Sequence, residues 1–424
     1  MPSISHYFSL RWWSALISIG ASLAASLPPP NLSRPVTLSD AMRWAAERDP
    51  QLDVWRAEAE IADGQIEQAL TRPNPVVGAE VENVIGSGPF QGIDGMELTL
   101  SVSQVLERFE KRDRRADLAR RNQSLTEWNR ELRLAALETE VRTAFVELLI
   151  AQETISLRRD QLGLATANRD ETAKLVEAAR SPTVELTRAE LAVRQQAFAL
   201  AQEERAADTA RANLALRWGV VSAPEFEVEG DIQIDDVPNL DTLLAALPRT
   251  AALGRFNAET SAREAGLALA EVDAKPDFEV FGGARYFNEA GGDAALVVGI
   301  QIPWALSDRN AGNIRSAQAQ LRAVEHRRAA TQRALMQSVA EAHLELVNAA
   351  AEYGSLEHDL RPIAEQTLAE TQTGYERGQF NLLAVLESRS ALFEIRESRL
   401  NALSRYARSL ARIEALIRPA NLTL

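Results

Sequence analysis

The chain contains no cysteine in its 424 residues. This absence excludes a disulfide framework, a thiol nucleophile and a thiolate metal site, and also a lipid anchor attached to an N-terminal cysteine. Aromatic residues make up only 6%, and 21 glycines are spread over the whole length, which suits long helices better than a globular enzyme. Glycine-rich phosphate loops, nucleophile elbows and HExxH motifs are missing as well. We therefore expect no enzyme activity and no cofactor.

Acidic residues outnumber basic ones, with 60 Asp and Glu against 46 Lys and Arg. The net charge of −14 argues against a nucleic-acid partner, because phosphate binding needs a basic surface. The only long apolar run follows Arg11 and covers roughly 12–14 residues, too short to span a bilayer as a helix. Small residues follow it, so the sequence predicts a secretory signal peptide over residues 1–26, with a short membrane anchor as the alternative.

The histidines do not form a metal-binding pattern. His326, His343 and His358 lie on one predicted helix, 17 residues (343 − 326) and 15 residues (358 − 343) apart. Ligands on one helix are normally separated by three or four residues. We expect ordinary helix residues here and no metal site.

An internal duplication is the most informative feature that is present. Leu98 matches Leu296, and the run from Val141 to Leu148 returns from Val339 to Leu346, at a constant offset of 198 (296 − 98 = 339 − 141). A fixed period indicates that one structural unit was duplicated. Each unit has a short alternating segment followed by a very long helical one.

The alternating segments predict two β-hairpins, over residues 76–104 and 277–302. Apolar side chains occupy one face of each strand: Leu98, Leu100, Leu296 and Val298 are the lipid-facing candidates. Polar side chains occupy the other face, with Glu80, Glu82 and Glu97 as candidates for the lumen of a barrel. Strands of about ten residues with this pattern fit a membrane β-barrel, but a half-buried soluble sheet alternates in the same way.

The helical segments carry apolar or small residues at heptad spacing. A helix without proline is expected over residues 105–178, and its duplicate begins near Ser307 and Asp308, with Pro362 expected to bend or loosen it. The 3-4 spacing buries a narrow stripe against neighbouring helices. Return helices are expected over 184–217 and 383–417.

Helix lengths predict how these segments lie together. The first long helix is expected to lie beside two shorter helices placed end to end, 184–217 and 240–272. The second long helix is expected to lie beside the C-terminal and N-terminal helices in the same way. The proline-rich linker 219–239 and the tail 418–424 should then meet midway along the helices as a belt. This divides the chain into a first repeat, 27–218, and a second repeat, 240–417.

Four strands cannot close a barrel by themselves. Unpaired backbone groups cost several kcal/mol each in lipid, and single-chain barrels begin at about eight strands. If the strands span a membrane, several chains must share one barrel.

Three segments give the chain a family resemblance. Arg72-Pro73-Asn74-Pro75 precedes the first strand, Ser103-Gln104 and Lys111-Arg112 flank the exit from the first hairpin, and Tyr375-x-x-Gly378 precedes Val385-Leu386-Glu387. With the duplication, they resemble the TolC-like outer membrane factors, and most resemble the CzcC-type branch that serves heavy-metal cation exporters. One departure is Phe109-Glu110, where that branch usually has glycines.

The resemblance implies a mostly α-helical fold with membrane β-structure. Three chains would form a homotrimer with one 12-stranded barrel in outer membrane lipid and one α-helical barrel across the periplasm. It further implies a passive duct for an inner-membrane RND pump, joined by a periplasmic adaptor (membrane fusion) protein. The exported substrate would be a heavy-metal cation such as cobalt, zinc, cadmium or copper.

The same resemblance places a gate at the far helical tip. Glu387 is the candidate for an acidic ring there. Related channels have a second acidic residue where this chain has Ala384, and a latch arginine where this chain has Phe380. The remaining tip candidates are Tyr375, Gly378, Ser181 and Glu185. The alternative for Glu387 is a solvated charge on the helix face, and the alternative for Tyr375 is ordinary packing between helices.

Two other functions fit the sequence. A duct for drugs or for type I protein secretion would have the same fold, because selectivity lies mainly in the pump. A soluble periplasmic coiled-coil adaptor or structural protein would use the same helices without a membrane, and would be extracted without detergent.

Overall fold

A computed structural model describes residues 30–221, 225–234, 236–289, 291–304 and 306–420. The predicted signal peptide and the end of the tail lie outside the described residues. The helices are α1 (Leu38–Arg48), α2 (Pro50–Leu70), α3 (Lys111–Glu177), α4 (Thr183–Leu216), α5 (Leu240–Ala246), α6 (Ala251–Asp273), α7 (Ala311–Ser355), α8 (Arg361–Glu376) and α9 (Leu382–Ile417). The strands are β1 (Val76–Glu82), β2 (Glu97–Leu106), β3 (Phe278–Phe287) and β4 (Asp293–Gln301).

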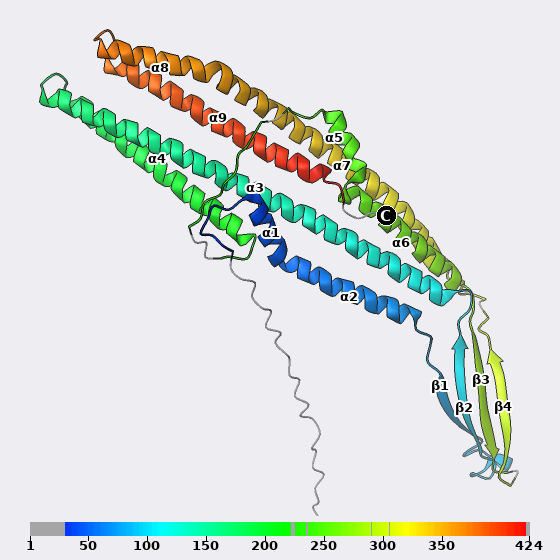
Figure 1. The fold of residues 1–424 in the computed structure, drawn as a ribbon. Coiled ribbons are helices and arrows are strands. Elements are labelled where there is room, and N and C mark those ends of the chain that lie inside the picture. The colour runs from blue at the N-terminus through cyan, green and yellow to red at the C-terminus, as the bar shows by residue number, and fades with distance from the viewer. Residues whose placement is uncertain (1–29, 222–224, 235, 290, 305, 421–424) are drawn as a thin grey trace, which may run out of the picture. The chain divides into compact units, whose positions relative to one another are not determined.

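Both predicted hairpins are present, and they join into one antiparallel sheet in the order β1-β2-β3-β4. The central pairing brings the two repeats together, with Leu100 opposite Ala284 and Leu106 opposite Phe278. Strands β1 and β4 have no further strand partner among the described residues, so both sheet edges are open (Figure 1).

The first long helix begins later than the sequence predicted. Residues 105 and 106 still belong to β2, and α3 starts only at Lys111 after a turn in which Phe109 and Glu110 have positive φ angles of 57° and 62°. Lys111 stabilises this turn by donating from Nζ to the Lys275 carbonyl at 2.6 Å and to Asp277 at 2.9 Å. Glycine adopts such angles without strain, whereas phenylalanine and glutamate rarely do.

Three other helix boundaries also differ from or refine the prediction. The helix expected over 240–272 is broken by a 3₁₀ turn, Leu247–Arg249, which contains Pro248. The N-cap residue of α7 is Asn310, in the left-handed region at φ 55°, and not Ser307 or Asp308 as predicted. Asp308 accepts a hydrogen bond from the Asn310 N–H. Pro362 loosens the second long helix as predicted, since a π turn, Leu356–Leu360, lies just before α8. Proline has no N–H to donate to the preceding helical turn, so the regular hydrogen-bond pattern is interrupted there.

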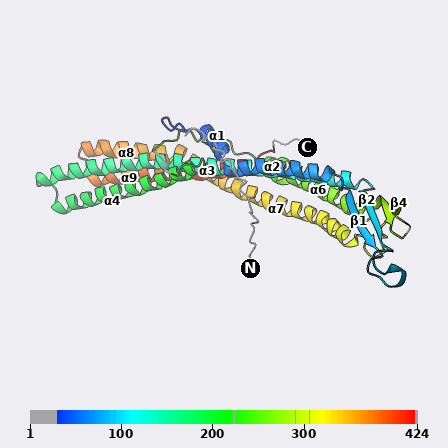
Figure 2. The same ribbon diagram turned by 90° about the horizontal axis from the view of Figure 1, so that it is seen from below.

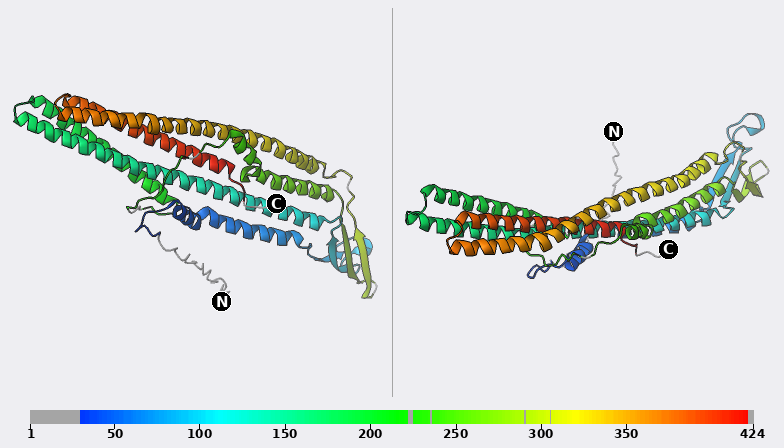
Figure 3. Two further views of the ribbon diagram at one scale, coloured as in Figure 1. Left: turned by 45° about the horizontal axis from the view of Figure 1, so that its top comes forward. Right: turned by 90° about the horizontal axis from the view of Figure 1, so that it is seen from above.

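The helices form two sets that run side by side (Figures 1, 2 and 3). Helix α3 packs against α4, α6 and α2, while α7 packs against α6 and α9, and α8 against α9. Within one chain, the prediction that the N-terminal helix lies beside the second long helix is therefore wrong. Helix α2 lies along α3, which leaves its apolar residues Val54 and Ile61 exposed.

The heptad positions of both repeats are buried. Val141 and its duplicate Val339 are fully buried, as are Leu148 and Leu346. The two sets belong to different hydrophobic cores, one among α1, α3 and α4 and one among α5, α7 and α9. The duplication therefore supplies each half of the molecule with an equivalent stripe.

The linker between the repeats connects the two cores midway along the helices. Phe226 and Val228 are buried in the first core, and Ile234 and Val237 pack against the second. Gln152 of α3 exchanges two hydrogen bonds with the backbone of Val228, at 3.2 and 2.9 Å. The tail also lies at this level, where Pro419 pairs with Thr250.

None of the described helices has an apolar stretch long enough to cross a bilayer.

Candidate functional site

The register of the sheet gives it two chemically different faces. Side chains of paired residues point to the same side of a sheet, so the strand pairing assigns every strand residue to a face. One face, the apolar face, has no charged residue: Val77, Ala79, Val81, Leu98, Leu100, Val102, Gln104, Leu106, Phe278, Val280, Gly282, Ala284, Tyr286, Ala294, Leu296, Val298 and Ile300.

The apolar face is not covered by any other part of the described chain. Leu296 is 87% exposed and Val298 81%, and Leu100 is exposed as well, while Leu98 is half-buried. All four predicted lipid-facing residues thus lie on this one face. An apolar patch of this extent normally marks a protein or membrane contact.

The opposite face is strongly acidic. It holds Glu80, Glu82, Glu97, Glu279 and Asp293, and its only cation among the strand residues is Arg285. The charge of this polar face is therefore −5 + 1 = −4 for each chain. The three predicted lumen residues lie together here.

Arg285 was not anticipated from the sequence. Its guanidinium lies 3.0 Å from Glu82 and 2.9 Å from Glu97, and it donates to the Thr99 hydroxyl at 2.9 Å. Asn83 also donates to Glu97, at 3.1 Å. Alternation alone places Arg285 on a polar face, but only the β2–β3 register shows that it lies opposite Thr99. Two of the three predicted lumen carboxylates are thus ion-paired, and Glu80 is exposed.

The second helical turn at the tip is built around two glycines. Gly378, at φ 71°, ends α8, and Gln379 and Phe380 donate backbone hydrogen bonds to the Gly374 carbonyl. The Phe380 ring lies directly on Gly374, where a Cβ would come within 2.2 Å of it. Phe380 therefore packs within its own turn.

The other tip candidates lie in or beside the two turns, which are at the same end of the helices (Figures 1 and 3). Glu185 is in the first turn of α4 and pairs with Arg188 at 2.8 Å, and Ser181 is half-buried in the loop before it. Tyr375 is half-buried at the end of α8. Glu387 is exposed on α9, and no described residue donates a hydrogen bond to it.

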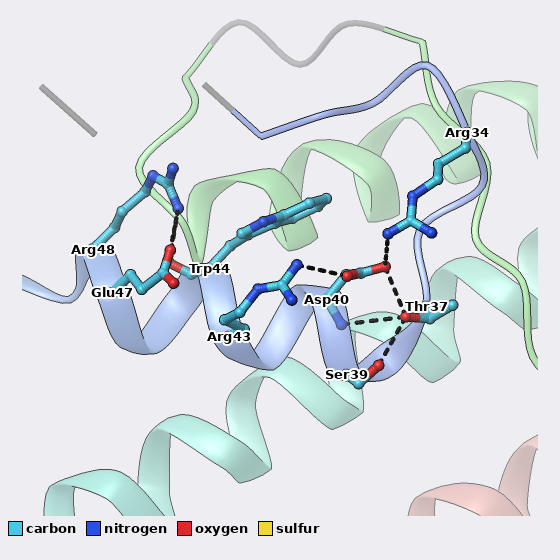
Figure 4. Close-up of polar contacts among 8 residues, drawn as sticks. All are labelled: Arg34, Thr37, Ser39, Asp40, Arg43, Trp44, Glu47 and Arg48. Carbon is cyan, nitrogen blue, oxygen red and sulfur yellow. Dashed lines mark hydrogen bonds and ion pairs between the residues drawn. The ribbon is translucent and has the colours of Figure 1, made fainter. Parts of the chain in front are cut away.

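A third polar cluster lies at the start of α1 (Figure 4). Thr37 is the N-cap and accepts from the Asp40 N–H. The buried Asp40 carboxylate accepts from the Thr37 hydroxyl at 2.9 Å, from Arg34 at 3.1 Å and from Arg43 at 2.7 Å. Burial by itself raises the pKa of Asp40, but the Thr37 hydrogen bond and the two arginine charges outweigh it and hold the pKa below its ordinary value.

We predict that Asp40→Asn weakens the attachment of α1. Because the folded-state pKa of Asp40 is lowered, its stabilisation is complete above the unfolded pKa and is lost as pH falls through the folded pKa. The substitution should lower the opening free energy of α1 by about 1–3 kcal/mol at pH 7. Hydrogen exchange of α1 amides measures this. A difference from wild type that did not shrink in acid, below about pH 4, would contradict the role of the charge.

The described residues contain no cluster of three histidine or carboxylate side chains that could hold a metal ion. Of the helical histidines, His343 hydrogen-bonds through Nε2 to the Pro238 carbonyl at 2.9 Å and so helps to fix the linker.

Comparison with known proteins relates this arrangement to one class of channel. Residues 244–417 match the family model described as "Outer membrane efflux protein". The chain is 26% identical over 394 residues to the cobalt-zinc-cadmium resistance protein CzcC of Cupriavidus metallidurans, covering 92% of this chain and 91% of that protein.

Solved structures match over almost the whole chain. The outer membrane protein VceC of Vibrio cholerae has a TM-score of 0.72 at 16% identity, over 90% of this chain and 96% of VceC. CusC has a TM-score of 0.70 at 15% identity, over 90% of this chain and 91% of CusC. These matches confirm the predicted fold: long helices and a four-stranded sheet of the TolC-like type. The chain therefore has the fold of the outer membrane protein VceC and of CusC, and its residues 244–417 match the outer membrane efflux protein model.

Proposed function

We propose that three copies of this chain form one passive exit duct of a tripartite efflux system. The observation that carries the proposal is the sheet, which has two open edges and an apolar face that nothing in the described chain covers. In lipid, open edges must be paired, and β4 of one chain can pair with β1 of the next. Three four-stranded sheets then close a 12-stranded barrel with lipid against the apolar face and water against the polar face.

Exposed apolar residues on the helices support the same assembly. Val54 and Ile61 of α2, and Met336, Leu344 and Val347 of α7, are exposed in the single chain. Because α2 does not cover α7 within one chain, α7 of a neighbouring copy is the natural occupant of that surface. Pairing between copies would restore the arrangement that the helix lengths predicted.

We further propose heavy-metal cations as the substrate, delivered by an inner-membrane RND pump through a periplasmic adaptor. The similarity to CzcC, a cobalt-zinc-cadmium resistance protein, extends over nearly the whole chain. The polar face carries −4 for each chain, so three copies would give the barrel lumen −12 (3 × −4). Rings of carboxylates favour cations without holding them tightly. A multidrug or protein-secretion duct is the second candidate.

The absence of cysteine makes the shared barrel directly testable. One cysteine replacing Val77 on β1 and one scanned over Leu296, Val298 and Ile300 on β4 should be joined by a short bifunctional reagent into covalent dimers and trimers. The matched control replaces Leu100 and Ala284, which pair within one chain, and should give links only inside monomers. Recovery of monomers alone from both sets, in membranes, would refute the shared barrel.

For the tip, we predict that Glu387→Gln raises single-channel conductance or lowers the cation-to-anion permeability ratio. Glu387 is exposed and unpaired among the described residues, so three copies at a narrow tip would concentrate negative charge. Reversal potentials in a salt gradient measure the change. Glu190→Gln, an exposed carboxylate on α4, is the control. Identical behaviour of both variants and wild type would remove Glu387 from the gate.

A further inference from the structure

A cavity lies where the sheet meets the helices of the second repeat. It has a volume of about 500 Å³ and is situated between the end of α6 and the start of α7, just beyond β4. Among its lining residues are Asp273, Lys275, Trp304, Leu306 and Asp308. If the sheet spans the membrane, this cavity lies at the boundary between lipid and periplasm.

Two large apolar side chains that line this cavity are exposed. Trp304 is 85% exposed and Leu306 72% exposed. With Ile302 they continue the every-second-residue spacing of Val298 and Ile300 past the end of β4. Tryptophan is typical of the membrane interface, where its ring is half in lipid and its N–H is in water. This end of the apolar face is therefore suited to lipid rather than to water.

The cavity offers charges of both signs. Lys275 lies with its ammonium 4.8 Å from the Phe109 ring centroid, and no described carboxylate pairs with it. Its neighbour Asp277 is already paired with Lys111 at 2.9 Å. Asp273 is exposed and has no ion pair with a described residue, and Asp308 accepts only the Asn310 N–H, through Oδ1. One ammonium and two carboxylates are thus available to a ligand.

The equivalent junction of the first repeat has no unpaired carboxylate among its described lining residues. At the offset of 198, Leu106 stands in place of Trp304 and Arg108 in place of Leu306. Arg108 stacks on Phe278 and Phe109, with centroid distances of 4.7 and 5.3 Å. The cavity there is lined by Glu107, which is paired with Arg115, and by Lys111. Its carboxylates Glu107, Glu110 and Asp113 are all paired within the chain, whereas Arg72 has no ion pair with a described residue. The duplication therefore supplies an internal comparison for the two unpaired carboxylates of the second repeat.

We propose that the cavity beside Trp304 binds the headgroup of a zwitterionic aminophospholipid of the periplasmic leaflet, one per chain. Lys275 would pair with the phosphate, Asp273 and Asp308 would accept hydrogen bonds from the ammonium, and Trp304 and Leu306 would cover the glycerol and acyl region. Charge-assisted hydrogen bonds of this kind favour a primary ammonium over choline, which has no N–H to donate. The proposal rests on the proposed function, because it requires the sheet to lie in the outer membrane.

The test is native mass spectrometry of the detergent-extracted assembly, titrated with phosphatidylethanolamine, phosphatidylcholine or phosphatidylglycerol. Wild type should retain phosphatidylethanolamine about tenfold better than phosphatidylcholine. Lys275→Gln should weaken retention of phosphatidylethanolamine by a similar factor, and Asp273→Asn with Asp308→Asn should abolish the preference over phosphatidylcholine. Arg322 is an exposed residue of α7 with no ion pair to a described residue, and Arg322→Gln should leave lipid retention unchanged.

Three results would overturn the proposal. One is equal retention of all three lipids by wild type, and a second is unchanged retention in Lys275→Gln. The third is loss of assembly in Trp304→Ala with lipid retention intact, since the neighbouring copy would then be the occupant. Conductance of the same samples separates this inference from the proposed function: a conducting assembly without lipid preference refutes only the lipid site.

Discussion

Replacing Val298 by arginine should lower the stability of the membrane-inserted protein by about 2–4 kcal/mol. Val298 is 81% exposed on the apolar face, near the middle of β4. A guanidinium at that position must be moved from water into hydrocarbon, and the cost is greatest near the bilayer midplane. Guanidinium titration of protein reconstituted in lipid vesicles, followed by tryptophan fluorescence, gives the unfolding free energy.

Val297→Arg is the matched control for this prediction. Val297 is the adjacent residue of the same type and lies on the polar face opposite Gly283. A change of less than about 1 kcal/mol is expected there if that face meets water. Gly299→Arg would be a poorer control, because a Cβ at Gly299 would come within 2.3 Å of the Phe281 ring. Equal tolerance of Val297→Arg and Val298→Arg would contradict a lipid-facing apolar surface.

Truncating Leu346 to alanine should destabilise the helical region by about 2–5 kcal/mol. Leu346 is fully buried in the core that α7 forms with α5 and α9. Removal of its side chain leaves a cavity whose walls relax only in part, and long helices constrain that relaxation. Thermal unfolding of the detergent-solubilised protein, followed by circular dichroism at a helical wavelength, measures the loss.

The duplication gives this prediction an internal replicate. Leu148, the counterpart of Leu346, is also fully buried, so Leu148→Ala should cost a similar amount. Leu191→Ala on α4, at a position that is exposed, should cost well under about 1 kcal/mol. If either buried leucine were as tolerant as Leu191, the heptad stripe would not be the core of its half.

The periodic parts of the chain could be predicted from the sequence because they repeat physical patterns. Alternation located both hairpins and assigned Leu296 and Glu82 to opposite faces, which the register confirms. Heptad spacing identified Val141 and Leu346 as buried positions, which the structure also confirms. In both cases one local period decides which side of an element is buried.

Features that depend on contacts between distant segments could not be predicted. The pairing of Arg285 with Glu82 and Glu97 needs the register between repeats, and the position of α2 beside α3 needs the packing of a whole chain. The late start of α3 was missed because Phe109 and Glu110 take left-handed angles that their side chains do not favour. The roles of Glu387 and Tyr375 stay predictions, since a gate is completed only by neighbouring copies.

Planar-bilayer conductance of the detergent-extracted protein tests the central claim most directly. Three copies with an acidic lumen and an acidic tip should give small channels whose reversal potential in a salt gradient shows preference for cations. Absence of conductance, together with recovery of the protein in the soluble fraction without detergent, would contradict the duct and favour a periplasmic coiled-coil protein.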